Sequence, residues 1–104
     1  MISGGNLVKH IVCWDITDKE NIEEHAKQVK NALETLHGKI SGLIKIEVGL
    51  NYSDSETSSD IVLYSEFESK EALSSYITHP LHVGVGQKIV RPLTCNRRMV
   101  DYEV

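Results

Sequence analysis

The chain has 104 residues, of which 40% are hydrophobic and 25% are charged, as in one ordinary globular domain and unlike a disordered or fibrous chain. With 15 acidic against 11 basic residues it carries a formal net charge of -4, and its only local basic cluster is Arg97-Arg98. This charge pattern excludes an extended phosphate-binding surface, so we expect no nucleic-acid partner.

The N-terminal segment and the cysteines bear on the cellular compartment. Residues 1–6 are expected to form a flexible lead-in to a single domain over residues 7–104. No apolar run approaches the roughly 20 residues of a membrane span, so we expect no membrane contact. Cys13 and Cys95 lack C-x-x-C spacing, and no leader-like segment opens the chain. A cytoplasmic protein with free thiols is therefore expected.

The first predicted strand covers residues 7–16 and is apolar on both faces. The alternating side chains are Val8, Val12, Trp14 and Ile16 on one face and Leu7, Ile11 and Cys13 on the other. A strand with two apolar faces has to be covered on both sides, which predicts a place in the centre of a sheet.

A first helix is predicted after this strand. Residues 17–20 read Thr-Asp-Lys-Glu and fit a capping box, so the helix should begin there. Apolar residues then recur at helical spacing, at Ile22, Ala26, Val29, Leu33 and Leu36. Gly38 supplies a left-handed residue that would end the helix.

The middle of the chain predicts two strands joined by a loop. Ile44, Ile46, Val48 and Leu50 alternate with polar residues and glycine, as in an edge strand buried on one face. Residues 51–60 are rich in Ser and Asp and predict a mobile loop. Residues 61–67 again have two apolar faces, which predicts a second central strand.

The last third of the chain predicts a helix and a final strand. Ser69 should cap a helix that ends at His79-Pro80, because a residue before proline avoids helical angles. A short irregular or helical piece follows over residues 81–90. Residues 93–104 alternate as a second edge strand, with Val100, Tyr102 and Val104 on one face and Met99, Asp101 and Glu103 on the other.

The order βαββαβ predicts an α+β subunit. Right-handed crossovers should place strands one and three side by side and parallel in the middle of the sheet, with the other two outside them. Two helices would cover one sheet face and leave apolar side chains on the other without a cover. A second copy of the sheet is the simplest cover, so we expect a twofold homodimer through the sheet faces.

Five segments resemble the stress-responsive dimeric α/β-barrel (Dabb) family, at that family's spacing: residues 8–12, 44–49, 64–69, 79–83 and 100–102. The resemblance implies a ferredoxin-like subunit that dimerises into a barrel. Its four-stranded antiparallel sheet would have the order 4-1-3-2, with two helices on one face. The resemblance implies little about reaction, since the family includes stress proteins without an agreed activity and a plant polyketide cyclase.

The residues that can carry chemistry are Tyr76, His79, His82, His10 and Asp101. Resemblance to the cyclase implies that His82 takes a proton from the carbon beside a carbonyl, while Tyr76 holds the carbonyl oxygen. Imidazole titrates near neutrality and a phenol can donate to an enolate oxygen, so both residue types suit enolisation. By resemblance, His10 and Asp101 lie near the same pocket, where the carboxylate would fix the imidazole tautomer.

Other functions stay open. The His79-Pro80 turn can serve the fold alone, or a pocket between sheet and helices can bind a small apolar ligand without catalysis. The spacing of His79 and His82 suits a metal, yet Pro80 breaks the helix between them and no further ligand is near, so we predict no metal. No cofactor is expected, because no motif supports the haem or quinol monooxygenases that share this barrel. An open cavity of a few hundred cubic ångströms reaching His82 would favour ligand capture or catalysis.

Overall fold

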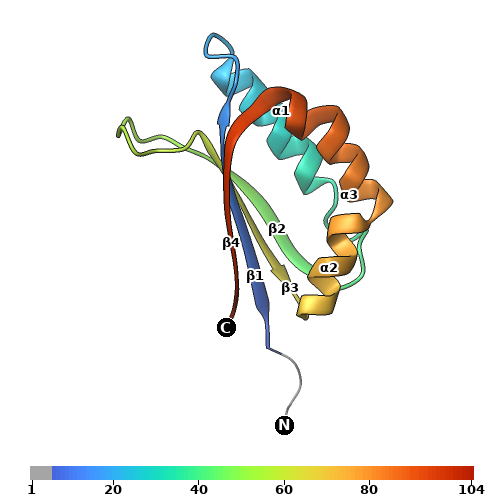
Figure 1. Ribbon diagram of the computed structural model, residues 1–104. Helices are drawn as coiled ribbons and strands as arrows, with labels where there is room; N and C mark the ends of the chain where they lie inside the picture. The colour runs from blue at the N-terminus through green and yellow to red at the C-terminus, as the bar shows by residue number, and fades with distance from the viewer. Residues whose placement is uncertain (1–5) are drawn as a thin grey trace.

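The computed structural model describes residues 6–104, so most of the lead-in expected at residues 1–6 lies outside the described residues. The elements are, in order, β1 (Val8–Ile16), α1 (Ile22–Glu34), β2 (Leu43–Leu50), β3 (Ile61–Phe67), α2 (Lys70–Thr78), α3 (Pro80–Val85), the π-helical turn η1 (Gly86–Val90), α4 (Arg91–Leu93) and β4 (Thr94–Glu103). Figure 1 shows the helices on one face of the sheet. Among residues 6–104, none of the helices has the length and hydrophobicity that a membrane crossing requires.

The four strands form one antiparallel sheet in the order β2-β3-β1-β4, which confirms the predicted 4-1-3-2 order. The parallel orientation expected for strands one and three is wrong, because β1 pairs antiparallel with β3. The α1 crossover makes β2 parallel to β1, and the β2–β3 hairpin then reverses the chain direction. The third strand therefore runs opposite to both of its neighbours.

The hydrophobic core lies between the sheet and the helices. Alternate residues of β1 and β3 face it, and α1 contributes Ala26, Val29 and Leu33. Two polar residues are buried on the same sheet face, His10 and Ser65. The Ser65 hydroxyl donates to the His10 carbonyl oxygen at 2.8 Å, which satisfies the serine. The His10 ring is not part of this bond, and it is hydrogen-bonded to Asp101 of β4 instead.

The start of α1 differs from the prediction. The helix begins at Ile22, and its N-cap Asn21 makes no side-chain capping bond. The Asp18 carboxylate instead accepts from the Glu20 amide and the Asn21 side chain, at 3.0 and 2.8 Å. Asp18 thus stabilises a turn that competes with an earlier helix start, and the predicted capping box is wrong. Gly38 is left-handed, as predicted, with φ +78°, but it does not end the helix, because α1 stops at Glu34 with Thr35 as its C-cap.

The β2 strand is an edge strand, as predicted, but its alternation is shifted. Leu43 is buried and Ile44 is 44% exposed, because the pairing with β3 changes register between Leu43 and Lys45. The preceding turn packs tightly on α2. A Cβ atom at Gly42, where φ is +85°, would lie 2.5 Å from the Ala72 Cβ. Only glycine fits this approach.

The end of α2 matches the prediction and leads into a longer helical segment. Ser69 Oγ accepts from the Ala72 amide at 3.0 Å, and α2 ends at Thr78 before the extended His79. The piece expected to be irregular or helical is helical throughout, from α3 through η1 to α4. This α3–α4 segment lies over the sheet beside α1 (Figure 1).

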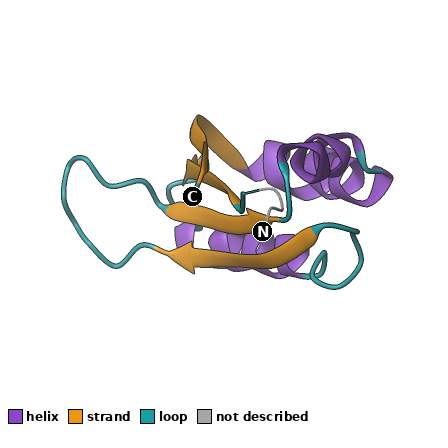
Figure 2. Ribbon diagram, turned by 90° about the horizontal axis from the view of Figure 1, so that it is seen from below, coloured by secondary structure: helices purple, strands orange, loops and turns teal. Residues whose placement is uncertain are grey.

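The loop between β2 and β3 extends away from the body of the sheet (Figures 1 and 2). Residues 51–57 are exposed, and their mobility stays a prediction.

The sheet face away from the helices has no cover within residues 6–104. Ile11, Cys13, Val62 and Tyr64 are half-buried on it, while Val100 of β4 is 51% exposed. Both cysteines are free thiols.

Candidate ligand-binding site

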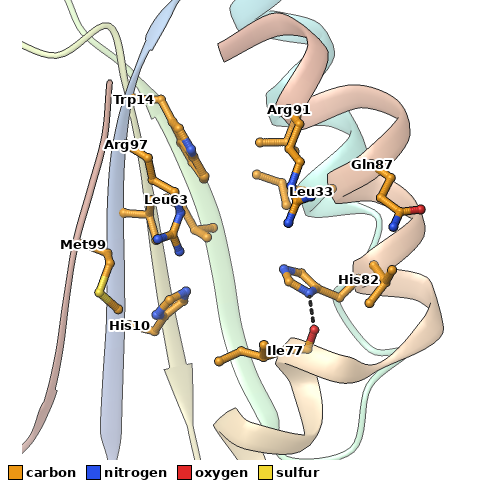
Figure 3. Close-up of a pocket in the computed structure, with 14 residues that line it drawn as sticks. His10, Trp14, Leu33, Leu63, Ile77, His82, Gln87, Arg91, Arg97 and Met99 are labelled. Atoms are coloured by element: carbon orange, nitrogen blue, oxygen red, sulfur yellow. Dashed lines mark hydrogen bonds between the residues drawn. The ribbon is translucent and has the colours of Figure 1, made fainter. Parts of the chain in front are cut away.

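A cavity of about 430 Å³ lies between the sheet and the α3–α4 segment, and Figure 3 shows the residues around it. Its apolar walls come from both layers and include Val12, Trp14, Leu33, Leu63, Ile77 and Val90. Two of the predicted site residues line it, His10 from β1 and His82 from α3. These rings approach from opposite walls, so a molecule in the cavity would contact both (Figure 3).

His10 is fixed by a carboxylate on the neighbouring strand. The pairing of β1 with β4 places His10 opposite Asp101, and His10 Nδ1 lies 2.5 Å from Asp101 Oδ1. An ionised carboxylate only accepts hydrogen bonds, so Nδ1 is the donor. In neutral His10 the other nitrogen, Nε2, therefore carries the lone pair. Of the two cavity histidines, Asp101 is therefore bonded to His10, and no bond joins it to His82 in the described chain.

His82 has the same protonation pattern with a different partner. Its Nδ1 donates to the Ile77 carbonyl oxygen at 3.1 Å, drawn as a dashed line in Figure 3. Burial lowers the pKa of His82, the hydrogen bond to the Ile77 carbonyl opposes this effect in part, and the positive charge of Arg97 adds to the lowering. The ring is thus neutral near pH 7, with Nε2 as its available base.

Tyr76 lies behind His82. Its ring centroid is 4.2 Å from that of His82 and 4.9 Å from that of Phe67. The residue is fully buried and does not line the cavity. Its hydroxyl finds no hydrogen-bond partner within residues 6–104, and burial raises the pKa of the phenol, so it stays protonated. In this arrangement Tyr76 supports the His82 ring and keeps one unused donor.

His79 has a capping role. Its Nδ1 accepts from the Leu81 amide at 3.1 Å, at the N-terminus of α3. His79 therefore caps the helix that follows it. His79 does not line the cavity. Of residues 6–104, no group of three or more His, Cys, Asp or Glu side chains could hold a metal ion.

Sequence reasoning missed two arginines at the cavity. Arg91 of α4 and Arg97 of β4 both line it, and no acidic side chain of the described chain does. Alternation along β4 puts Arg97 on the same face as Met99 and Asp101, so this signal could have found it. A bulge lies at this point of the strand, because Asn96 and Arg97 both lie opposite Trp14, and Asn96 has a left-handed φ of 54°.

Comparison with known proteins agrees with this architecture. The family model Dabb, described as Stress Responsive A/B Barrel Domain, matches residues 8–104. The chain belongs to the Dabb family. A curated Dabb relative, a stress-response A/B barrel domain-containing protein of Arabidopsis thaliana, is 32% identical over 102 residues. These cover 92% of this chain and 36% of the relative, so the chain spans about a third of that protein's length.

Solved structures share the fold of this Dabb domain. A dimeric protein of unknown function and ferredoxin-like fold from Bacteroides fragilis is 39% identical, with a TM-score of 0.84 over 98% of this chain and 100% of that one. A second protein from Arabidopsis thaliana, whose crystal structure was refined as an ensemble, is 28% identical, with a TM-score of 0.70 over 93% and 94% of the two chains. The ferredoxin-like prediction is confirmed.

Proposed function

We propose that this Dabb chain works as a homodimer in which each subunit binds a small, largely apolar molecule in the cavity between the sheet and the α3–α4 segment. The observation that carries the proposal is the cavity itself, with a volume of about 430 Å³ and apolar walls that reach two imidazole rings. Small-molecule sites typically measure about 300 to 1,000 Å³ and combine apolar walls with a few convergent polar groups. The cavity has both properties.

Packing energetics support a ligand. Protein interiors have few voids larger than a water molecule, and an unfilled apolar cavity lowers stability. The core next to this cavity is tightly packed, with Val12 and Leu63 each at most 2% exposed. Because this cavity meets solvent at Arg91 and Arg97, its apolar walls lie beside water when it holds no ligand, and a bound apolar body would favourably displace that water.

The uncovered sheet face supports the homodimer. Ile11, Val62 and Tyr64 form a half-buried patch on β1 and β3, and Val100 and Tyr102 extend it on β4 with 51% and 44% exposure. An apolar patch of this kind is typical of an interface between copies. The Bacteroides fragilis relative, 39% identical, is dimeric. Light scattering at micromolar concentration should give the mass of two chains, and a stable monomer would contradict the homodimer.

Ligand binding can be tested with the chain's own tryptophan. Trp14 is the single tryptophan and lines the cavity, so its fluorescence reports occupancy. We expect 1-octanol to shift this fluorescence saturably and to raise the melting temperature. Gly86→Phe starts a bulky side chain at the cavity wall, where a Cβ meets no atom within 4 Å, and should weaken binding.

Gly84→Phe is the matched control. A Cβ at Gly84 also meets no atom within 4 Å, but Gly84 does not line the cavity. This variant should bind 1-octanol as the wild type does. Absence of a saturable signal from the wild-type protein, across a series of alcohols of increasing length, would contradict the proposed function.

A second candidate function is proton transfer at the carbon beside a carbonyl. Neutral His82, with Nδ1 held by the Ile77 carbonyl and Nε2 unbonded within residues 6–104, favours it as the base. His82 Nε2 would take the proton, the C–H electron pair would form the enolate double bond, and the carbonyl oxygen would take the negative charge. Tyr76 is the proposed donor to that oxygen; because Tyr76 does not line the cavity, this role requires the substrate oxygen to reach past the His82 ring. Return of the proton to carbon completes the cycle.

Deuterium exchange tests this second candidate. Aromatic β-keto compounds are incubated with the protein in D₂O, and loss of the proton signal is followed by NMR. We expect exchange above the buffer rate that falls at least about tenfold in His82→Ala. Binding without enhanced exchange would leave the ligand-binding function and remove the catalytic one.

A further inference from the structure

We propose that the ligand of this cavity is an organic anion, a small molecule with an apolar body and a carboxylate that Arg91 and Arg97 bind. This inference rests on the proposed ligand-binding function and names the chemical class of the ligand. It is carried by two arginines on opposite walls of a cavity that has no acidic lining residue in the described chain. Figure 3 shows Arg97 on the sheet side and Arg91 on the helix side, both directed into the space between the walls.

The two guanidinium groups are available to a ligand. Within residues 6–104, the ion pairs involve lysines and His10, and neither Arg91 nor Arg97 takes part in one. Arginine presents planar donors that match a carboxylate in a two-point contact. Both residues are exposed as well as lining, so they lie where the cavity meets solvent. A carboxylate bound there keeps part of its hydration while the apolar body is buried.

Arg97 lies on the helix-facing side of β4, next to a bulge in that strand. Opposite Trp14 the strand carries one extra residue, Asn96, whose φ of 54° is unusual for a residue other than glycine. The Asn96 side chain donates to Asp15 Oδ2 at 2.9 Å and holds the bulge in place. Arg98 pairs with Cys13, which faces away from the helices, so Arg97 faces them, as do Met99 and Asp101 of the same strand. Bulges are frequent beside binding sites.

The remaining polar groups of the cavity fit an anion as well. His82 lies in the positive field of Arg97, which together with burial lowers the pKa of its imidazole. A bound carboxylate would supply the missing negative charge and raise that pKa. Gln87 adds a neutral amide to the lining from η1. The apolar residues Leu33, Leu63 and Val90 line the rest of the cavity and suit a hydrocarbon body.

The test compares three probes with one body and different heads, namely octanoate, 1-octanol and octylammonium. Their dissociation constants are measured from Trp14 fluorescence. The wild-type protein should bind octanoate at least about tenfold more tightly than 1-octanol, as expected for charge-assisted hydrogen bonds, and octylammonium most weakly. Arg91→Gln and Arg97→Gln should each reduce this preference, and the double variant should remove it while 1-octanol affinity stays within about twofold.

Two matched controls remove a positive charge outside the cavity. Lys88→Gln lies on η1 near Arg91, and Arg98→Gln is the next residue on β4 and pairs with Cys13; neither residue lines the cavity. Both variants should keep the octanoate preference. Equal affinity of the wild type for octanoate and 1-octanol would overturn the anion inference while the ligand-binding function stands. Failure of all three probes would overturn the ligand-binding function, and the anion inference with it.

Discussion

The two faces of the sheet are built from the same strands but closed in different ways. Facing the helices, Val8, Val12 and Ile16 of β1 are at most 2% exposed, because α1 and α2 cover them within one chain. Facing away, Ile11 and Cys13 of the same strand are half-buried, with no cover in the described chain. The helix-covered face therefore determines the stability of the subunit, and we expect the uncovered face to determine its assembly.

The largest expected effect is a loss of stability when a residue on the helix-covered face of the sheet is truncated. Phe67 is fully buried on β3 and packs on Tyr76. Phe67→Ala should lower the free energy of unfolding by about 3–5 kcal/mol, because it leaves a cavity in a packed core. Urea denaturation followed by circular dichroism measures this loss. Val62→Ala on the other face of β3 should cost the subunit less, and equal losses would contradict the assignment of the core.

A charge on the sheet face that the helices leave uncovered should weaken dimer formation. Val100 is 51% exposed in the subunit and pairs with Ile11. Val100→Lys should raise the dimer dissociation constant at least about tenfold, since the ammonium group would be desolvated in an apolar interface. Analytical ultracentrifugation measures the constant. Leu81→Lys, at a site of 45% exposure on α3, is the control and should leave it unchanged. The same constant in both variants would argue against an interface at Val100.

A further prediction concerns how much the hydrogen bond between the buried His10 ring and Asp101 contributes to stability. Asp101→Ala removes the carboxylate that accepts from the buried His10 ring. A buried donor without a partner costs about 1–3 kcal/mol, and we expect the lower part of this range because the Asp101 side chain is 34% exposed. Asp101→Asn keeps an acceptor and should recover part of the loss. Urea denaturation of both variants measures the difference, and an Asp101→Ala protein as stable as the wild type would be the contrary result.

A smaller effect concerns pH. In the unfolded chain His82 titrates near its ordinary pKa of 6.5, and burial lowers the pKa in the fold, where Arg97, His10 and His79 also face the ring. Above the unfolded value both states are neutral and the contribution to stability is complete. As the pH falls, the unfolded chain binds a proton first, so stability is lost until the folded pKa is passed. In urea denaturation at a series of pH values, His82→Gln should therefore lose less stability than the wild type between about pH 7.5 and about pH 5.5.

Hydrophobic periodicity predicted the strand order of the sheet, because β1 and β3 carry apolar residues on both faces and therefore have to be central strands. Ser69 and His79-Pro80 also gave the bounds of α2, since capping and proline geometry are local. The antiparallel sheet implied by the Dabb resemblance is confirmed, whereas the crossover rule gave the wrong orientation of β1 and β3, because it does not account for how the hairpin reverses the chain. The register shift near Ile44 was missed for a related reason, because strand pairing decides it.

The candidate site was predictable only in part. His10, His82 and Asp101 were named before any contact was known, and two of them line the cavity while the third holds His10. The arginines were not found: alternation from Met99 and Asp101 puts Arg97 on the helix-facing side of β4, but it does not show that a cavity lies beside this end of the strand. Arg91 depends on the path of the α3–α4 segment over the sheet. Both follow from tertiary placement, which local patterns do not encode.

The smallest expected effect on stability comes from Tyr76→Phe, which tests whether the Tyr76 hydroxyl acts as a donor. The Tyr76 hydroxyl is buried without a partner in residues 6–104, so Tyr76→Phe removes an unsatisfied polar group and keeps the ring beside His82. The variant should be as stable as the wild type or more stable by up to about 1 kcal/mol. If Tyr76 donates to an enolate oxygen, deuterium exchange should still fall at least about tenfold in this stable variant. An unchanged exchange rate would limit Tyr76 to packing behind His82, and the exchange would then proceed without a donor from Tyr76.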